Sequence, residues 1–476
     1  MTEKQRSALF LLYPFRAAIN LGKPIIREYL KALKKHANLQ PPSYGYLKEV
    51  LGLAESYGFV QRVQQFPQTE LLQINPYFSM FLKSQSKTAF PAGEMRSIEI
   101  AFLHYYDWLG HQLFAMYEGS SPEERQEDIE FLALEYENMR AAILLHLKHA
   151  TYDFNGVLTA VNVFLDAAHR HLERWELANF IKTELESLPE NERNEFVEFQ
   201  LVDALDSMGA AMVSLRRFEE ASVCFVRALD YYHAFGLDKE YPAAARTLYQ
   251  SLAAVAAYQA KWEDSNAYYS KMLEIAERFG DMDGISSYYL NTGKNFLELE
   301  DYETAAAHFE KAAKLHQVLD KIAWVGVSYN YLGILHVSKR EYDIAEAWLQ
   351  KALSIFQRLD DKRRMGEVYN EYSLLYAGKK DFDQSLSYAK KAISLLTDTG
   401  KQDAIGMAFL NFCTASVGMM KFEEAVDYLR KAFWVFHQIK DTDKIKTALA
   451  IAQQISMRTD SAVYDELRAF ASGSIE

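Results

Sequence analysis

Apolar and polar residues follow one another along most of this chain with the spacing of amphipathic helices, and in the second half that pattern itself repeats. An aromatic residue is followed by an acidic one, a small residue three places on, a bulky residue at seven and usually Ala at ten, as in YETAAAHFEKA. A fixed period of this size predicts a stacked array of helical hairpins whose function lies on its surface. After a first step of 44 the aromatic residues stand 40 residues apart: Phe218, Trp262, Tyr302, Tyr342, Phe382 and Phe422.

A second helix is predicted before each aromatic helix. A small residue stands twelve places ahead of the small residue of the aromatic helix, as Gly293 does before Ala305 and Gly333 before Ala345. Two antiparallel helices approach closely only where their crossing points carry little side chain, so these pairs predict the contact between helix A and helix B of each repeat. Six such repeats are expected over residues 201–440.

The Gly/Ala, aromatic, Ala, bulky, Ala spacing resembles the tetratricopeptide repeat. The period of 40 residues is longer than the roughly 34 usual in that family and is similar to the extended repeats of kinesin light chains and bacterial peptide-sensing regulators. The resemblance covers all six repeats. It implies an all-α fold, a right-handed superhelix (an αα solenoid) whose helix A residues line a concave groove that holds peptides or partner helices.

Residues 1–83 have a different pattern. Amphipathic helices are predicted at about 4–18, from near Pro24, and from a Pro-Pro pair to Gly58. Two β-like runs, FVQRV and ELLQI, stand on either side of QQFPQT and are followed by a short helix, NPYFSMFLKS. Three helices followed by a hairpin is the order of elements in a winged helix, so a small N-terminal winged-helix domain is expected.

Three further segments complete the predicted organisation. Residues 84–95 are polar with Pro and Gly, and are expected to form a linker. Residues 96–200 are expected to form a helical bundle with a degenerate repeat, in which Trp175 and Ala178 take the aromatic and small positions. Residues 441–476 are expected to form a capping helix and a tail.

The order of the predicted elements carries a second resemblance. A winged helix ending in LLQINPYFSMFL, a helix with the acidic-x-x-Asn pattern of LEYENMRAAI and then extended repeats resemble the C-terminal half of STAND-type signal-transduction ATPases. The resemblance implies that the winged helix belongs to a nucleotide switch and the repeats to a sensor. The chain departs from that family because it has no GxxxxGK[ST], the loop and lysine that hold nucleotide phosphates. We therefore expect either a sensor and switch fragment of such a protein or a relative that lacks the ATPase domain.

Composition and cysteine usage agree with a helical protein in a reducing compartment. Only 10 prolines and 21 glycines occur in 476 residues, which favours helices over turn-rich β structure. Cys224 and Cys413 lie in different repeats, so no disulfide is expected between them. The sequence has no apolar run of the roughly 18 residues that a membrane helix needs and no convincing signal peptide, and a cytoplasmic location without membrane association is expected.

Catalytic and metal-binding patterns are absent from the sequence. It contains no HExxH, CxxC or GxSxG. The pairs His146 with His149 and His169 with His171 lack a third ligand and are expected on helix surfaces. No catalytic residue, metal or cofactor is therefore expected, and the chain is not expected to be an enzyme.

Four asparagines near the middle of helix A are the strongest candidates for ligand contact. An Asn amide offers a donor and an acceptor, which an extended peptide backbone requires of its host, and peptide-binding members of the resembling family use helix A asparagines in this way. The alternative is that the asparagines adjust packing between repeats, since two of them are one residue out of phase, a rotation of about 100°. The expected groove residues are Asn291, Asn330, Asn370, Asn411 and Lys294, with Glu298, Ser338, Glu367, Thr414, Tyr288, Tyr289, Tyr329 and Tyr331 as weaker candidates.

The N-terminal segment differs in charge from the remainder. Residues 1–90 hold 12 Lys and Arg against 5 acidic residues, a balance of +7 in a chain of net charge −13. A winged helix can place its third helix in the DNA major groove. That helix carries Lys48 against Glu49 and Glu55 here, so protein docking is favoured over DNA binding. The candidates for docking or nucleic-acid contact are Lys31, Lys34 and Lys35.

Together these patterns predict a non-enzymatic scaffold or sensor module in signalling, which holds a protein or peptide partner in its repeat groove. The alternative hypothesis is a transcription regulator whose winged helix binds DNA under control of the repeat domain.

Overall fold

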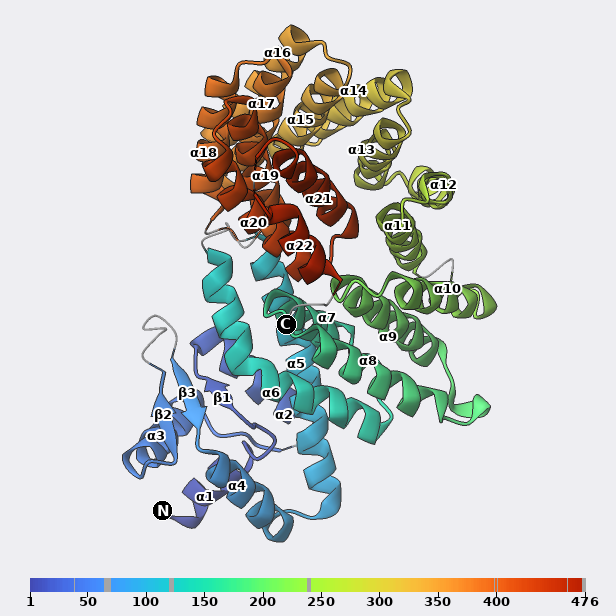
Figure 1. The fold of residues 1–476 in the computed structure, drawn as a ribbon. Coiled ribbons are helices and arrows are strands. Elements are labelled where there is room, and N and C mark those ends of the chain that lie inside the picture. The colour runs from blue at the N-terminus through green and yellow to red at the C-terminus, as the bar shows by residue number, and fades with distance from the viewer. Residues whose placement is uncertain are drawn as a thin grey trace. The chain divides into compact units, whose positions relative to one another are not determined.

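Helices make up most of the protein. The computed structural model describes residues 1–37, 39–63, 70–119, 124–237, 241–397, 399, 401–459 and 461–472. Among these residues lie 22 α-helices and three short strands (Figure 1). The chain divides into two compact parts, Met1–Ala244 and Ala245–Glu476, called unit 1 and unit 2 below. The predicted all-α fold is confirmed.

Unit 1 begins with short helices around a three-stranded antiparallel sheet in the order β1-β3-β2. Ala18 of β1 pairs with Gln73 of β3, and Val60 of β2 pairs with Ile74. The elements are α1 (Glu3–Phe10), β1 (Ala18–Asn20), α2 (Lys23–His36), α3 (Tyr44–Ser56), β2 (Val60–Arg62), β3 (Leu71–Ile74) and α4 (Pro76–Ala89).

The first predicted helix, at about 4–18, is too long. α1 ends at Phe10, and Pro14, which has no amide hydrogen to donate, stands in the turns that follow. Strand β1 begins at Ala18 and pairs with β3, more than fifty residues away, so the local pattern gave no sign of it. The segment QQFPQT lies outside the described residues, and the name winged helix for this arrangement stays a prediction.

The predicted linker at 84–95 differs from the structure. Residues 84–89 continue α4 and residues 92–95 begin α5, which leaves Phe90 and Pro91 between the two helices. α4 packs against α1, so this polar segment is held in a helix by tertiary contacts. The Ser86 hydroxyl is buried and donates to the carbonyl of Leu82 at 2.7 Å.

Long helices form the rest of unit 1, and one continuous hydrophobic core joins them to the N-terminal elements. The acidic-x-x-Asn pattern anchors this junction. Asn138 Oδ1 accepts from the amides of Arg16 (2.6 Å) and Ala17 (3.1 Å), and its Nδ2 donates to the Ala18 carbonyl at 2.8 Å. The helices are α5 (Ala92–Gly119), α6 (Glu124–His149), α7 (Asn155–Ala167), α8 (His171–Glu186), α9 (Glu195–Ser214) and α10 (Phe218–Ala234), with a 3-10 turn at Glu190–Glu192.

The histidines of α6 are not on the helix surface, contrary to expectation. His146 is fully buried, and its Nδ1 donates to the Thr151 carbonyl at 2.6 Å. His149 lies 2.6 Å from Glu99 Oε2. α6 packs against both α5 and α7, and the two histidines lie on the packed side of the helix while Leu144 and Lys148 are exposed. Burial lowers the pKa of His146 to about 4, so its ring is neutral and structural.

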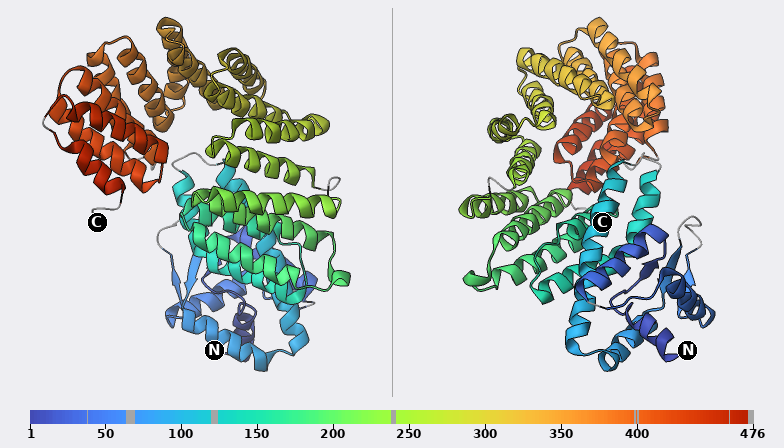
Figure 2. Two further views of the ribbon diagram at one scale, coloured as in Figure 1. Left: turned by 45° about the vertical axis from the view of Figure 1, so that its right-hand side comes forward. Right: turned by 180° about the vertical axis from the view of Figure 1, so that it is seen from behind.

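Unit 2 is a run of helical hairpins, seen as antiparallel pairs lying side by side in Figure 2. Each of the six aromatic residues of the ladder is the first residue of a B helix, including α10 in unit 1, as the period predicted. The C-terminus holds two helices where one was expected. The elements are α11 (Pro242–Tyr258), α12 (Trp262–Phe279), α13 (Met282–Glu298), α14 (Tyr302–Val318), α15 (Ile322–Ser338), α16 (Tyr342–Arg358), α17 (Lys362–Gly378), α18 (Phe382–Leu396), α19 (Gln402–Gly418), α20 (Phe422–Gln438), α21 (Thr442–Ser456) and α22 (Val463–Ala471).

Small residues lie at the crossing of helices A and B, as predicted. A Cβ on Gly333 would lie 2.5 Å from Leu349 Cδ2, so only glycine fits this approach. In the next repeat Ser373 and Ser385 bond each other's backbone, with Ser385 Oγ donating to the Ser373 carbonyl at 2.8 Å. The crossing therefore fixes the rotation of helix A about its axis and determines which side chains face away from helix B.

Helices A and B lie on opposite sides of the curve of unit 2. In Figure 1, α13, α15 and α19 follow the inner side of the curve, and α12, α16 and α18 follow the outer side. The inner side is consequently built from helix A side chains.

Candidate functional site

A stripe of polar and charged side chains runs along the inner helices of unit 2. Positions 40 residues apart are equivalent in this array, so Asn291, Tyr331, Glu371 and Asn411 occupy one helical position. Electrostatic coupling reaches between helices along it, from Lys294 on α13 to Arg364 on α17 and from Tyr331 on α15 to Glu371 on α17. We call this stripe the inner face, and it comprises Asn291, Lys294, Glu298, Trp324, Asn330, Tyr331, Arg364, Glu367, Asn370, Glu371, Met407, Asn411 and Lys444.

Lys294 is held on the inner face by its neighbours. Its ammonium donates to Asn291 Oδ1 at 3.1 Å and lies 5.0 Å from the centre of the Tyr331 ring. Burial, with a smaller contribution from Arg364, lowers the pKa of Lys294 to about 8. An ammonium group over an aromatic ring gains a cation–π interaction, but the lowered pKa means that its surroundings still favour the neutral form.

Asn330 and Asn370 each leave an acceptor without a partner. Both Oδ1 atoms are buried and accept no hydrogen bond from the described residues. The orientation of Asn370 is fixed because its Nδ2 donates to the Ala404 carbonyl on α19 at 3.0 Å. A buried acceptor without a donor costs about 1–3 kcal/mol. Ten other buried side-chain atoms of the described residues also lack a partner, among them Glu198 Oε2 and Gln200 Oε1 on α9.

Asn411 has a packing role, the alternative that the sequence left open. It is 3% exposed, and its Nδ2 donates to the backbone carbonyl of Asn370 at 3.2 Å. The one-residue difference in position between Asn370 and Asn411 gives the two side chains different partners. Asn370 reaches forward to α19, whereas Asn411, one residue later in the repeat, reaches back to α17. Asn370 and Asn411 therefore link neighbouring repeats, and Asn330 and Asn370 each keep a buried, unpaired acceptor.

Two glutamates on α17 lie next to these asparagines. Burial raises the pKa of Glu371 to about 7; Lys444 opposes the shift and Glu367 adds to it. Burial also raises the pKa of Glu367, although Arg363 Nη1 lies 3.0 Å from its Oε1. Glu371 was missed from the sequence. Its equivalence to Asn291 and Asn411 in the 40-residue period was the signal that could have identified it.

An arginine supports the middle of the inner face. Arg364 Nε lies 3.1 Å from Asp361 Oδ2, and its guanidinium stands 5.1 Å from the centre of the Trp324 ring. Burial is the main reason that the pKa of Arg364 is lowered. Arg364 and Trp324 were not among the sequence candidates either, because helix periodicity alone does not reveal contacts between repeats.

Several weaker candidates point elsewhere. Tyr289 binds Lys311 of α14, and the ring of Tyr329 packs 5.2 Å from Trp348 of α16, so both face helix B. Tyr288 likewise packs against Tyr289 and His308. The hydroxyls of Ser338 and Thr414 bond carbonyls of their own helices. Of the four tyrosines considered, Tyr331 is the one that belongs to the inner face.

The N-terminal lysines are exposed. Lys31, Lys34 and Lys35 lie on the solvent side of α2, whose other side packs on α5, and Lys31 Nζ lies 2.6 Å from Glu28 Oε1. On α3, the helix expected to face DNA, Lys48 is engaged by Glu70. This geometry gives no specific observation in favour of DNA binding, and the three lysines remain candidates for docking.

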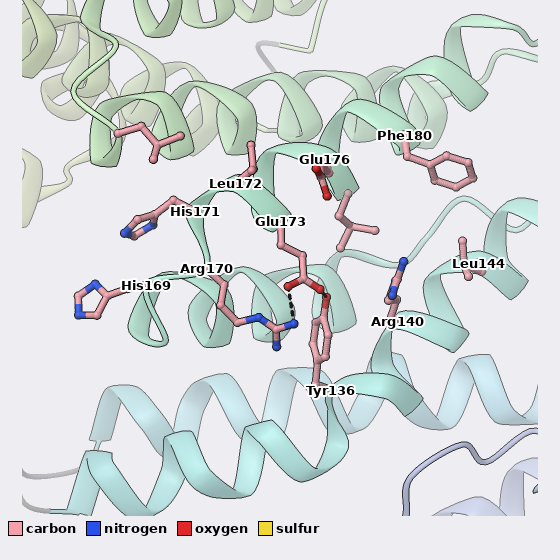
Figure 3. A pocket seen from close by; sticks show the side chains of 12 residues that line it. Tyr136, Arg140, Leu144, His169, Arg170, His171, Leu172, Glu173, Glu176 and Phe180 are labelled. Atoms are coloured by element: carbon pink, nitrogen blue, oxygen red, sulfur yellow. Dashed lines mark hydrogen bonds and ion pairs between the residues drawn. The ribbon is translucent and has the colours of Figure 1, made fainter. Parts of the chain in front are cut away.

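A cavity of about 760 Å³ lies in unit 1, between α6 and the start of α8 (Figure 3). Three of the side chains that line it interact with one another. Arg170 pairs with Glu173 and lies 4.9 Å from the centre of the Tyr136 ring, and the Tyr136 hydroxyl donates to Glu173 Oε1 at 2.5 Å. We take the inner face of unit 2 as the candidate binding site, because the predicted residues Asn330 and Asn370 lie there with unpaired acceptors.

The described residues contain no group of three or more His, Cys, Asp and Glu side chains arranged to hold a metal ion. Within the same ranges, no helix has both the length and the apolar character that crossing a bilayer requires. Both cysteines are free, and burial raises the pKa of the Cys413 thiol to about 12.

The repeats match a known family. The family model described as tetratricopeptide repeat matches residues 243–317 and 324–398, so these segments are tetratricopeptide repeats, as the spacing predicted. No curated protein matches the sequence.

Solved structures with similar arrangements are distant. A signal transduction ATPase with numerous domains (STAND) protein with a tetratricopeptide repeat sensor, from Pyrococcus horikoshii, is 16% identical with a TM-score of 0.46, covering 94% of this chain and 66% of its own. The apo quorum sensor NprR from B. thuringiensis is 13% identical with a TM-score of 0.49, covering 78% and 96%. Aspartyl phosphate phosphatase F from Bacillus subtilis is 14% identical with a TM-score of 0.48, covering 75% and 88%. At these values the likeness carries no argument about function.

Proposed function

We propose that this protein is a non-enzymatic scaffold or sensor that binds an extended peptide segment of a partner along the inner face of unit 2. The observation that carries the proposal is the pair of buried acceptors, Asn330 Oδ1 and Asn370 Oδ1, on neighbouring inner helices. Amide hydrogens of an extended backbone are donors of the kind these atoms lack.

The state of Lys294 supports the same function. A lysine whose pKa is lowered to about 8 by burial stands in an unfavourable environment for its charge. A peptide carbonyl or carboxylate placed beside it would accept from the ammonium and compensate for that cost. The inner face thus offers acceptors at Asn330 and Asn370 and a donor at Lys294, both of which a peptide backbone can use.

Selection from a displayed library of random heptapeptides on the full-length protein tests the proposal. The affinity of recovered peptides is then measured by fluorescence anisotropy for the wild type and for the double variant Asn330→Leu with Lys294→Met. We expect about a tenfold or greater loss of affinity, because each lost hydrogen bond contributes about 1 kcal/mol.

The exposed amide of Gln317 on the outer helix α14 provides the matched control. Gln317→Leu removes an amide of similar size without touching the inner face, and its affinity should equal that of the wild type. Recovery of no peptide, or equal affinities of the double variant and the wild type, would contradict binding on the inner face.

A further inference from the structure

A separate cavity of about 280 Å³ opens on the inner face between α17, α19 and α21, all within unit 2. It is slightly smaller than the roughly 300–1,000 Å³ of small-molecule pockets, so it suits one long side chain rather than a folded segment or a cofactor. Its lining consists of Glu367, Asn370, Glu371, Leu374, Asp403, Ala404, Met407, Asn411, Phe436, Asp441 and Lys444.

The charges around the cavity are predominantly acidic. Glu367 and Glu371 come from α17, Asp403 from α19, and Asp441 from the N-terminus of α21, against the single cation Lys444. Among the described residues, Lys444 forms no ion pair shorter than 4.0 Å with any of them. Glu367 forms an ion pair with Arg363, and one carboxylate oxygen of Asp441 caps α21 by accepting from the Lys444 amide. The carboxylates of Glu371 and Asp403 have no such partner among the described residues.

A buried acceptor points to the same kind of ligand. Asn370 is 5% exposed and lines the cavity, and its Oδ1 has no donor among the described residues. The hydrogen bond from its Nδ2 to Ala404 fixes which end of the amide is free. The cavity is lined by this asparagine and by carboxylate side chains. Acceptors of this kind match a group with several donors and no acceptor, which among protein side chains means an ammonium or a guanidinium.

Apolar walls complete the fit. Leu374, Met407 and Phe436 lie between the polar groups of the lining. Lysine and arginine bury their methylene stems against apolar surface while the charged end meets polar partners, and an aromatic ring nearby favours a cation further. The lining therefore matches both ends of a long basic side chain.

We propose that this cavity receives a lysine or arginine side chain of the peptide bound on the inner face, with Asn370 Oδ1 and the carboxylate of Glu371 accepting from its cationic end. The inference deepens the proposed function and rests on it, since it assumes that a peptide lies on the inner face. It assigns the ligand a chemistry: an extended peptide with a basic residue at one fixed position.

The protonation of Glu371 makes the binding depend on pH. The groups that face it are Glu367 on its own helix, Asp403 on α19, Lys444 on α21 and Tyr331 on α15. Because burial raises the pKa of Glu371 to about 7, part of the population is protonated at neutral pH and must ionise when a cation binds. Affinity for a basic peptide should therefore increase from pH 6 to pH 8.

The test compares peptides selected from the random heptapeptide library on the wild type and on Glu371→Gln. We expect the wild type to enrich Lys or Arg at one position and Glu371→Gln to lose that enrichment. Exchanging Arg for citrulline, a neutral group of the same shape, should lower the affinity for the wild type about tenfold or more, a typical cost of an unpaired charged partner. The same exchange should have little effect on Glu371→Gln, because both changes remove one interaction.

Glu310→Gln on the outer helix α14 is the control and should keep the wild-type preference. Peptides recovered without basic enrichment, or an enrichment that Glu371→Gln leaves intact, overturn the cavity assignment while the proposed function stands. If no peptide is recovered, the proposed function fails, and calorimetric titration with acetyl-arginine amide against acetyl-citrulline amide decides the cavity on its own. If the arginine amide binds, the citrulline amide does not, and Glu371→Gln abolishes the binding, the cavity assignment is supported. If the two amides bind with equal affinity, or neither binds, the assignment is overturned.

Discussion

At the scale of single residues, asparagine has two separate roles in this chain. Both ends of the Asn138 amide form hydrogen bonds within unit 1. Besides its bonds to residues 16–18, its Nδ2 donates to Glu135 Oε2 at 3.0 Å. Asn330 and Asn370 keep a free buried acceptor on the inner face of unit 2. The fully hydrogen-bonded amide of Asn138 is structural, and the unpaired acceptors of Asn330 and Asn370 are the ones that the proposed peptide would satisfy.

Replacing Asn138 by leucine should lower the free energy of unfolding of unit 1 by about 3 kcal/mol or more. The leucine has similar volume but leaves two backbone amides and a carbonyl buried without partners, each at a cost of about 1–3 kcal/mol. Chemical denaturation followed by circular dichroism measures the change. Asn191→Ala, at an exposed asparagine of the same unit, should leave stability unchanged. Equal denaturation midpoints for Asn138→Leu and the wild type would contradict this role.

Glu371 should make the stability of unit 2 depend on pH. Its pKa is raised in the folded state from 4.5 to about 7, so between these values the folded chain binds more protons than the unfolded chain. This contribution to stability is present below pH 4.5 and is lost as pH rises through 7. Relative to Glu371→Gln, the wild type should therefore have a lower urea midpoint at pH 8 than at pH 5. A difference between the two proteins that is the same at both pH values would show that Glu371 is ionised throughout.

At the scale of helices and strands, the crossing of helices A and B determines the inner face. Gly333 against Leu349, and Gly293 against Phe309, bring the helix axes close and fix the rotation of helix A. The residues that face the ligand are those left on the side away from this contact. A change at the crossing should therefore affect both the stability of unit 2 and the geometry of the inner face.

Gly333→Val should destabilise unit 2 by about 2 kcal/mol or more, because its side chain would meet Leu349 at 2.5 Å and force the helices apart. Thermal unfolding measures the loss. Gly52→Ala on α3 is the control, since no atom lies within 4 Å of the added carbon, and it should gain about 0.5–1 kcal/mol from helix propensity. Adding Leu349→Ala to Gly333→Val should recover part of the loss, and failure to do so would place the cause outside this contact.

The helical repeats were predictable because their determinants are local and repeated. The six aromatic residues begin six helices, and the small residues lie at the crossings, as spacing alone predicted. Strand β1 was not predictable, since it is a strand only through its pairing with the distant β3. The linker prediction differs for a similar reason: residues 84–89 belong to α4, which packs against α1, and the Ser86 hydroxyl lies 3.4 Å from the carbonyl of Phe10.

The candidate site was predictable in part. The 40-residue period identified helix A and the four asparagines. The roles of the out-of-phase pair, Asn330 and Asn370, depend on contacts between repeats, such as that of Asn370 with Ala404, which the period does not reveal. Glu371 and Arg364 escaped notice because charge on a helix usually indicates a solvated face, and only packing between helices shows that these charges are desolvated.

At the scale of the whole molecule, the two units are held together differently. Unit 1 has one continuous core that runs from Ala8 to Ala204. The core of unit 2 is divided into several smaller clusters along the stack, for example one around Phe309 and one around Leu349. In stacked repeats stability is carried by neighbour contacts, so cooperativity is more local than in a single core.

Unfolding of the full chain should therefore occur in two phases, a sharp transition for unit 1 and a broader one for unit 2. Hydrogen exchange followed by mass spectrometry resolves them by peptide. Asn138→Leu should accelerate exchange in the helices of unit 1, and Gly333→Val should do so in those of unit 2. A single transition in which each variant affects all helices equally would contradict the division.

Photo-crosslinking locates the peptide on the molecule and so distinguishes binding on the inner face of unit 2 from binding elsewhere. A library-selected peptide carrying benzoylphenylalanine is irradiated with the full-length protein, and the linked residues are identified by mass spectrometry. We expect links to inner-face residues of α13, α15, α17 and α19, and we expect these links to be lost in competition with unlabelled peptide. Links concentrated on the outer helices α12, α16 and α18, or on unit 1, would contradict binding on the inner face.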